Sequence, residues 1–280
     1  MTRWVLLRGL SREQAHWGDF PQTLARALAP GHSVLCLDLP GAGALCDQPS
    51  PLRVEAMVQA CRAQLSALTV AAPGLPPIPT VLVGLSMGGM VATAWAQAWP
   101  LELAGLVLVN SSARRFSPAL QRLRWAALPA LLGLLWAQLR GDAAALERAV
   151  LRLTSAQPQH HGAALAAWCA VRQARPVALR NVLRQLLAAA RYRGPAQPPG
   201  VPVLVACSAA DRLVSPTCSV RLAQHWQAAI CQHPWAGHDL PLDDGPWLAT
   251  RITQWWQAQQ GDDAAGCGLG ADQVPPASLR

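Results

Sequence analysis

The sequence predicts an α/β protein built on a mostly parallel sheet that is flanked by helices and carries an inserted helical segment. Short apolar runs alternate with segments of helical spacing, and this rhythm stops between residues 111 and 200, where no strand candidate occurs. The chain has 280 residues, of which 52% are hydrophobic and 14% charged. That balance is typical of a well-packed globular enzyme and not of a disordered chain.

Six runs have the length and composition of strands. Most are apolar at every position rather than at alternate positions, as strands covered on both faces require. In chain order the runs are 4–7, 33–39, 80–85, 105–110, 201–207 and 228–233. Segments with helical spacing lie between or after them, at 19–29, 52–71, 87–99, 217–227 and 245–258.

The interruption predicts a helical cap over residues 113–197, inserted into a core of residues 1–112 and 198–260. The cap segment is rich in Leu, Ala, Arg and Gln, and it ends at "RGPAQPPGVP", whose prolines and glycines cannot continue a helix. Residues 261–280 are small, polar and aperiodic, so we expect a disordered tail there.

The longest apolar run, 125–139, is too short for a membrane-spanning helix, which needs about 20 residues. It predicts an apolar lid helix, with contact to a lipid surface as the alternative. The first residues enter a strand at once, without the apolar region and cleavage site of a signal peptide, and no two of the eight cysteines form a C-x-x-C pair. These features favour a cytoplasmic protein with reduced cysteines.

Positive charge is concentrated in the cap. The chain contains no lysine, and residues 114–193 hold thirteen of its 23 arginines but only two acids, Asp142 and Glu147, a net charge of +11. Such a surface favours an acidic macromolecule or an anionic substrate, although charge runs are often just solvated faces. Nucleic acid is disfavoured because the sequence has one tyrosine, two phenylalanines and no recognised DNA or RNA module.

The sequence "GLSMGG" places Ser86 on a turn between a strand and a helix, in the form G-x-S-x-G. Gly84 and Gly88 suit a turn too tight for side chains at those positions, which leaves the serine exposed at the sheet edge. The following helix directs its N-terminal N–H groups at the same point, where they favour a developing negative charge. The pattern predicts a nucleophilic serine. A chance junction of small residues is the alternative.

A serine nucleophile needs a histidine base and an acid that orients the histidine. On a strand–turn–helix of this kind the three follow in the order serine, acid, histidine. Asp211 in "CSAADRLVSP" and His238 in "WAGHDLPLDD" fit this order, each just beyond a predicted strand. His16 is a competing histidine. Asp243 and Asp244 compete with Asp211, but we expect them to cap the last helix.

Together, the motifs "LDLPGAG", "GLSMGG", "LVLVNSS", "SAADRLV" and "AGHDLP" resemble those of the α/β-hydrolase superfamily. The resemblance extends over nearly the whole chain. It is closest to the small carboxylesterases, such as the pimeloyl-acyl-carrier-protein methyl ester esterase of biotin synthesis. It implies an α/β-hydrolase fold and a serine-dependent hydrolase that cleaves a carboxylic ester or thioester without a metal or an organic cofactor. It also points to an acidic acyl carrier protein as the partner of the arginine-rich cap.

The resemblance further implies that the backbone N–H groups of Leu10 and Met87 form the oxyanion hole. The family commonly has His-Gly after the first strand, where this chain has Arg8-Gly9, so Arg8 either pairs with a core carboxylate or meets an anionic substrate group. The residues expected to line the substrate pocket are Arg8, Trp17, Trp125, Trp136 and Trp168. An aminopeptidase, a lyase and a non-catalytic binding protein with a lapsed site remain alternatives.

Overall fold

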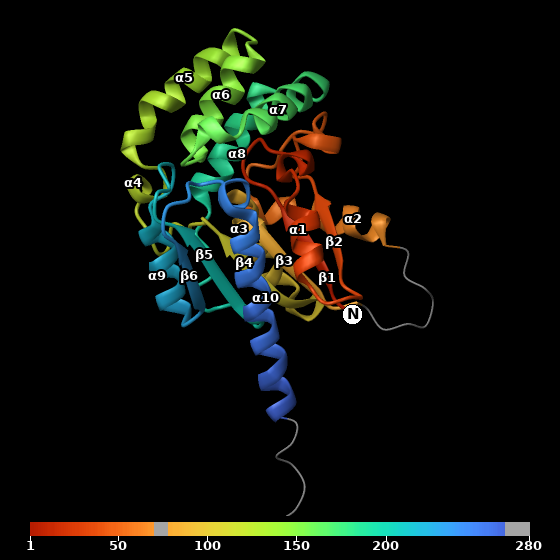
Figure 1. Ribbon diagram of the computed structural model, residues 1–280. Helices are drawn as coiled ribbons and strands as arrows, with labels where there is room; N and C mark the ends of the chain where they lie inside the picture. Colours follow the sequence, from red (N-terminus) through yellow and green to blue (C-terminus); the bar gives the residue numbers. More distant parts are fainter. Residues whose placement is uncertain (70–77, 267–280) are drawn as a thin grey trace, which may run out of the picture.

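The computed structural model describes residues 1–69 and 78–266. Its centre is a six-stranded sheet in which every neighbouring pair is parallel, in the order β2-β1-β3-β4-β5-β6 (Figure 1). The strands are β1 (Arg3–Leu7), β2 (Ser33–Leu37), β3 (Thr80–Leu85), β4 (Leu103–Val109), β5 (Val203–Ser208) and β6 (Ala229–His233). The prediction of a mostly parallel sheet flanked by helices is confirmed.

Helices cover both faces of the sheet. On one face lie α1 (Phe20–Ala27) and α10 (Leu240–Gly266), and on the other lie α2 (Val54–Leu68), α3 (Met87–Ala98) and α9 (Pro216–Trp226). Between β4 and β5 the chain forms α4 (Ala119–Arg122), α5 (Leu128–Leu139), α6 (Ala143–Thr154), α7 (Gly162–Ala174) and α8 (Leu179–Arg191). Short 3-10 helices occur at Gln14–Trp17, Gly43–Leu45, Pro100–Glu102, Trp125–Ala127 and Pro158–His160.

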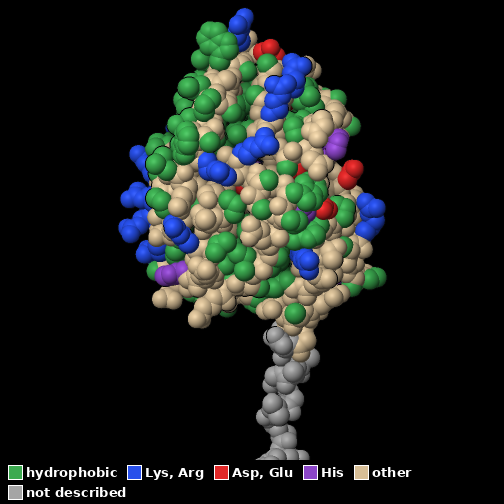
Figure 2. Space-filling model, turned by 60° about the vertical axis from the view of Figure 1, so that its left-hand side comes forward, with side chains coloured by type: hydrophobic (Ala, Val, Ile, Leu, Met, Phe, Trp, Pro, Cys, Tyr) green, Lys and Arg blue, Asp and Glu red, His purple; other side chains and the backbone are tan. Residues whose placement is uncertain are grey.

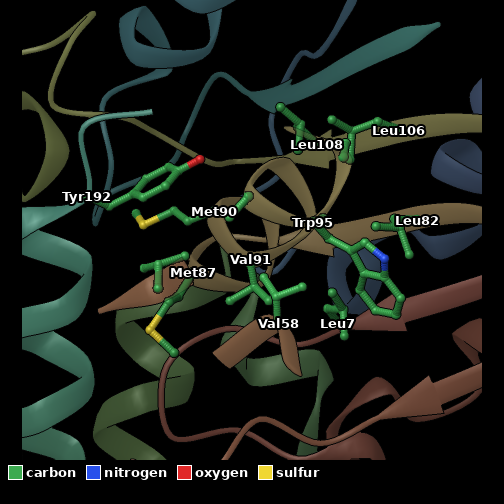
Figure 3. Packing of buried hydrophobic residues seen from close by; sticks show 14 of the residues in the cluster. Leu7, Val58, Leu82, Met87, Met90, Val91, Trp95, Leu106, Leu108 and Tyr192 are labelled. Atoms are coloured by element: carbon green, nitrogen blue, oxygen red, sulfur yellow. The ribbon is translucent and has the colours of Figure 1, made fainter. Parts of the chain in front are cut away.

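The sheet separates two hydrophobic clusters. Along β1, Val5 and Leu7 point into the cluster beneath α2 and α3, whereas Trp4 and Leu6 point into the cluster beneath α1 and α10. Figure 3 shows the first cluster, with side chains of α3 packed against those of the strands. Each fully buried large side chain contributes about 2 kcal/mol, so this two-sided burial is what fixes the sheet under the site.

The last helix is longer than predicted. We expected it over 245–258. Helix α10 (Leu240–Gly266) is non-helical at Asp244 (φ −153°, ψ 71°), so the part after this kink begins where expected, but it continues to Gly266. The segment expected to be a disordered tail therefore starts as helix, and residues 267–280 lie outside the described part of the chain. Asp244 accepts a hydrogen bond from the N–H of Trp247 at 3.0 Å, which confirms its predicted capping role.

Asp243 does not cap that helix. Its carboxylate accepts hydrogen bonds from the backbone N–H of Gly237 at 2.7 Å and of Ala156 at 2.9 Å. It therefore joins the loop before α10 to the segment after α6. Within residues 1–69 and 78–266, no helix is both long enough and apolar enough to cross a bilayer.

The strand order reverses between β1 and β3, since β2 lies on one side of β1 and all later strands lie on the other. In open parallel sheets the loops at the carboxyl ends of the strands diverge at such a point and leave a crevice. The loops after β1 and β3 carry Gly9 and Ser86, so the fold itself puts the predicted nucleophile at this crevice.

Candidate active site

Ser86 occupies the turn between β3 and α3 in a backbone conformation that only glycine adopts readily, with φ 56° and ψ −117°. Space at the turn is minimal. A Cβ on Gly88 would lie 2.1 Å from the carbonyl oxygen of Leu7, and one on Gly84 would lie 2.5 Å from the backbone of Gly89. The glycine pattern around the serine is therefore a steric requirement of this turn.

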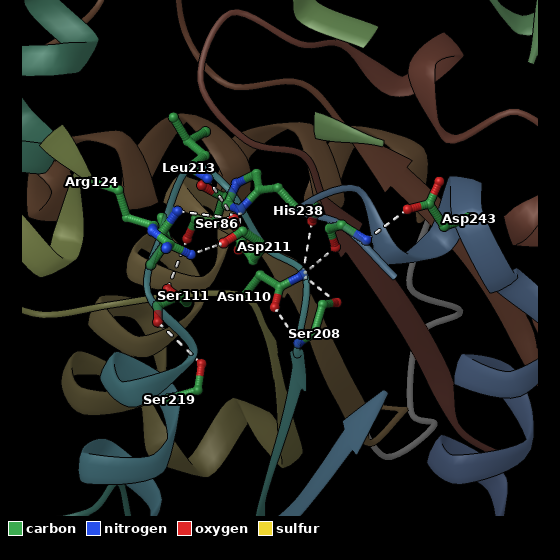
Figure 4. A network of polar contacts seen from close by, with 12 residues as sticks. Ser86, Asn110, Ser111, Arg124, Ser208, Asp211, Leu213, Ser219, His238 and Asp243 are labelled. Atoms are coloured by element: carbon green, nitrogen blue, oxygen red, sulfur yellow. Dashed lines mark hydrogen bonds and ion pairs between the residues drawn. The ribbon is translucent and has the colours of Figure 1, made fainter. Parts of the chain in front are cut away.

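His238 and Asp211 are brought together from the loops after β6 and β5. Nδ1 of His238 lies 2.7 Å from Oδ2 of Asp211, and both residues are buried (Figure 4). The other carboxylate oxygen of Asp211 accepts hydrogen bonds from the N–H groups of Leu213 and Val214, at 2.8 and 2.9 Å. Arg124 donates to the backbone carbonyl of Asp211 at 2.7 Å. These contacts fix the carboxylate, and through it the orientation of the imidazole.

Asn110 holds the histidine loop and was not singled out from the sequence. Its side-chain amide donates to the backbone carbonyl of His238 at 2.8 Å, while its amide oxygen accepts from the N–H of Ser208 at 2.9 Å. The residue is buried and has a positive φ of 47°. The sequence feature that could have identified Asn110 is its place in "LVLVNSS", as a polar amide directly after the apolar run of β4.

Arg8 forms a buried ion pair with Asp239, the residue next to His238. Its two terminal nitrogens lie 3.0 and 2.6 Å from the two carboxylate oxygens, and its guanidinium stacks on Trp17 at 4.8 Å from the ring centroid. Burial alone would raise the pKa of Asp239, but the charge and hydrogen bonds of Arg8 outweigh burial and lower it. Of the two roles expected for Arg8, the structure supports pairing with a core carboxylate.

The two N–H groups expected to form an oxyanion hole flank the serine. Gly9 approaches so closely that a Cβ on it would lie 3.3 Å from the Cβ of Ser86, which places the loop carrying Leu10 beside this serine. Met87 is the first residue of α3, directly after the serine. Neither N–H group has a hydrogen-bond acceptor among the described residues, so both are free to bind an oxyanion.

Ser86 and His238 line one cavity of about 430 Å³. Two of the predicted pocket residues, Arg8 and Trp125, also line it. The other walls are mainly apolar and come from the sheet edge, α3, α5 and α8, with Leu85, Met87, Met90, Leu128, Leu131, Leu134, Leu186 and Val214 among them. Such walls suit an apolar acyl chain.

The remaining three predicted pocket residues do not line this cavity. Trp17 is buried against Phe20 and under Arg8. Trp168 is buried beneath the guanidinium of Arg12, 4.2 Å from its ring centroid. Trp136 lies on the outer face of α5 with 62% of its surface exposed. Sequence alone could place Trp136 and Trp168 in the helical cap, but not on a particular face of a helix.

His16, the competing histidine, is buried away from the cavity. Its Nδ1 accepts a hydrogen bond from the N–H of Glu13 at 3.1 Å, and its ring packs on Trp168. Burial and the nearby Arg12 and Arg8 lower its pKa, so it stays neutral. The described residues contain no group of three or more His, Cys, Asp or Glu side chains arranged to hold a metal ion.

Comparison with known proteins gives one sequence match and several structural ones. A family model described as "Alpha/beta hydrolase family" matches residues 4–251. No curated protein matched the sequence.

Solved structures resemble the chain over most of its length. An esterase from Thermogutta terrifontis is 22% identical with a TM-score of 0.66, over 92% of this chain and 90% of that one. An enol-lactonase from Burkholderia xenovorans LB400 is 20% identical with a TM-score of 0.70, over 92% of both chains. An esterase from a Rhodococcus species is 20% identical with a TM-score of 0.67, over 92% and 90%. At these identities the likeness establishes the fold and not the reaction.

Proposed function

The chain belongs to the alpha/beta hydrolase family, and from that premise we propose that it is a serine hydrolase acting on carboxylic esters or thioesters of apolar acyl groups. The observation that carries the proposal is the constellation at the sheet edge. A strained serine and a histidine bound to a buried aspartate line the same apolar cavity.

In the proposed reaction, His238 accepts the proton of Ser86 as the serine oxygen attacks the acyl carbonyl. The N–H groups of Leu10 and Met87 hold the oxyanion of the tetrahedral intermediate. Its collapse forms the acyl-enzyme, and His238 returns the proton to the leaving alcohol or thiol. Asp211 keeps the imidazole in the required tautomer and stabilises its positive charge. His238 then removes a proton from water, which hydrolyses the acyl-enzyme.

The cavity argues against an aminopeptidase, which would need carboxylates to bind the free amine of its substrate. Among the described lining residues the only carboxylate is Asp239, and both its oxygens are bound by Arg8. A lapsed site is also disfavoured, because Arg8 supports the loop on which the oxyanion hole depends rather than filling the cavity in front of Ser86.

A hydrolysis screen tests the proposal. p-Nitrophenyl esters and acyl thioesters of graded chain length are assayed with the wild-type protein and with Ser86→Ala as the blank. We expect activity toward apolar acyl groups in the wild type and a loss of at least about 10³-fold in the variant. Equal rates for the two proteins would remove Ser86 from the mechanism.

A further inference from the structure

Helix α8 buries polar side chains and exposes apolar ones, which is the reverse of an ordinary surface helix. Its polar residues Asn181 and Gln185 are fully buried, and they bind the N–H of Ser50 at 3.0 Å and the carbonyl of Pro40 at 3.1 Å. Its leucines point outward instead, with Leu183, Leu186 and Leu187 between 38% and 53% exposed. Amphipathic helices normally bury their apolar side, so this face lacks a partner among the residues that the structure describes.

Helix α5 presents a second outward apolar face. Leu128, Leu132, Leu135 and Leu139 follow one another at helical spacing and are 41% to 68% exposed, and Trp136 lies beside them. The helix packs on α6, and its remaining side chains include Ala130, Ala137 and the half-buried Leu131 and Leu134 that line the catalytic cavity. A stripe of large apolar side chains that faces water is unfavourable unless something covers it.

These exposed residues are continuous with the catalytic cavity. Leu120, Trp125, Leu128 and Leu186 are exposed at the surface and also line the cavity that holds Ser86. We call the surface formed by Leu120, Trp125, the outward leucines of α5 with Trp136, and the outward leucines of α8 the docking face. An apolar molecule that leaves a layer in contact with the docking face would therefore enter a mainly apolar cavity that also holds Ser86.

Exposed arginines occur in the same cap segment as the docking face. Those exposed in the cap are Arg114, Arg115, Arg140, Arg148, Arg152, Arg175, Arg180, Arg191 and Arg193, whereas the one exposed carboxylate in this segment of the described chain is Asp142. Of these arginines, Arg175 is already paired with the carboxylate of Glu13. Figure 2 shows arginines distributed over the upper half and flank of one side of the molecule among hydrophobic side chains, with few acidic groups. Arg140 stacks on Trp136, 5.5 Å from its ring centroid.

A second cavity, of about 420 Å³, lies between α5 and α6, and three arginines and several small residues line it. The arginines are Arg124, Arg152 and Arg212, and no carboxylate occurs among the described lining residues. Leu153 lines both this cavity and the catalytic one, so the two are neighbours. Guanidinium groups in such a groove suit the phosphate of a lipid headgroup.

We propose that the docking face binds an anionic phospholipid surface, with leucine and tryptophan side chains in the interfacial layer and arginines on the phosphates. This combination of a Leu- and Trp-rich face with an arginine border is that of an interfacial helix, which lies on a membrane without crossing it. The delivery of an apolar ester from that surface to Ser86 rests on the proposed function. The binding itself does not.

Two other occupants fit less well. An acidic carrier protein would satisfy the arginines but would not require so many exposed leucines, and it is the partner expected from sequence. A second copy of the chain would cover the leucines but would bring two strongly positive caps together.

The test uses Ser86→Ala protein, so that no lipid is consumed, in sedimentation with vesicles of phosphatidylcholine alone or mixed equally with phosphatidylglycerol. We expect binding to the anionic vesicles at least about tenfold tighter than to the neutral ones, and weaker in high salt. Adding Leu132→Ser and Leu139→Ser, neither of which lines the catalytic cavity, should reduce binding roughly tenfold or more. Leu101→Ser, at a fully exposed leucine outside the cap, is the matched control and should change nothing.

Thermal unfolding of each variant verifies that it is folded. Three results would overturn the proposal: no binding to anionic vesicles, equal binding by the paired serine variant and the control, or a dimer in solution that the paired variant dissociates. Salt-sensitive binding to an acyl carrier protein with none to vesicles would assign the face to a protein instead. Because the assay measures binding and not turnover, each outcome is independent of whether the esterase proposal holds.

Discussion

The ion pair between Arg8 and Asp239 joins the loop after β1 to the loop that carries His238, and replacing Arg8 by methionine tests its role. The substitution keeps much of the apolar stem but leaves the Asp239 carboxylate, 3% exposed, without a counter-charge. Removing one partner of a buried pair costs about 3–5 kcal/mol, whereas replacing both by apolar groups is often nearly neutral. We therefore expect Arg8→Met to lose about 3–5 kcal/mol of unfolding free energy. The double variant with Asp239→Leu should regain at least about 2 kcal/mol of it.

Urea unfolding of the wild type, both single variants and the double variant measures this coupling. The pH dependence provides a second readout. Because the pKa of Asp239 is lowered in the folded protein, the stability it contributes is present above the unfolded carboxyl pKa, about 3.9, and is lost as the pH falls through the folded value. The wild type should lose this contribution below about pH 4, and the double variant should not. Additive single effects, or Arg8→Met within about 0.5 kcal/mol of the wild type, would refute the reasoning.

Three further predictions concern the supports of the site. Asn110→Ala should lower kcat by about tenfold or more, with a smaller effect on KM, because the backbone carbonyl of His238 loses the hydrogen bond from the Asn110 amide. Unchanged kinetics would show that this hydrogen bond is not needed to position the His238 loop. Gly88→Ala should prevent stable folding, because its Cβ would meet the backbone of β1 at 2.1 Å. Gly133→Ala is the matched control on α5, where a Cβ has nothing within 4 Å, and should gain about 0.5–1 kcal/mol in a urea titration. Burial raises the pKa of Cys61 to about 12, so iodoacetamide at pH 8 should leave this thiol unlabelled in the folded protein, as peptide mass spectrometry can verify.

The sheet and the three candidate catalytic residues could be predicted from the sequence because their signals are local. Apolar runs such as 80–85 are long enough to identify buried strands, and the steric demand of a tight turn appears directly as the glycines at 84 and 88. In a parallel sheet the strand ends meet at one edge, so the loops carrying Ser86, Asp211 and His238 were expected to converge.

Contacts between residues far apart in the chain could not be predicted, because no local sequence pattern indicates them. A core carboxylate was one of the two partners expected for Arg8, but the sequence does not show which acid of the core it is. The structure identifies Asp239. The tryptophans at 17, 136 and 168 were expected in the pocket from their positions along the chain, and their burial or exposure depends on how their segments pack against neighbouring elements. The inverted face of α8 was equally hidden, because helical periodicity indicates that a helix has an apolar side but not whether that side is covered.

Reaction of the protein with a fluorophosphonate, followed by peptide mapping, tests most directly whether Ser86 is activated by His238 and Asp211. The account predicts one adduct, on the peptide containing Ser86, with a labelling rate that falls by orders of magnitude in His238→Ala and substantially in Asp211→Asn. An adduct on a different residue, or a Ser86 labelling rate that does not depend on His238, would contradict it.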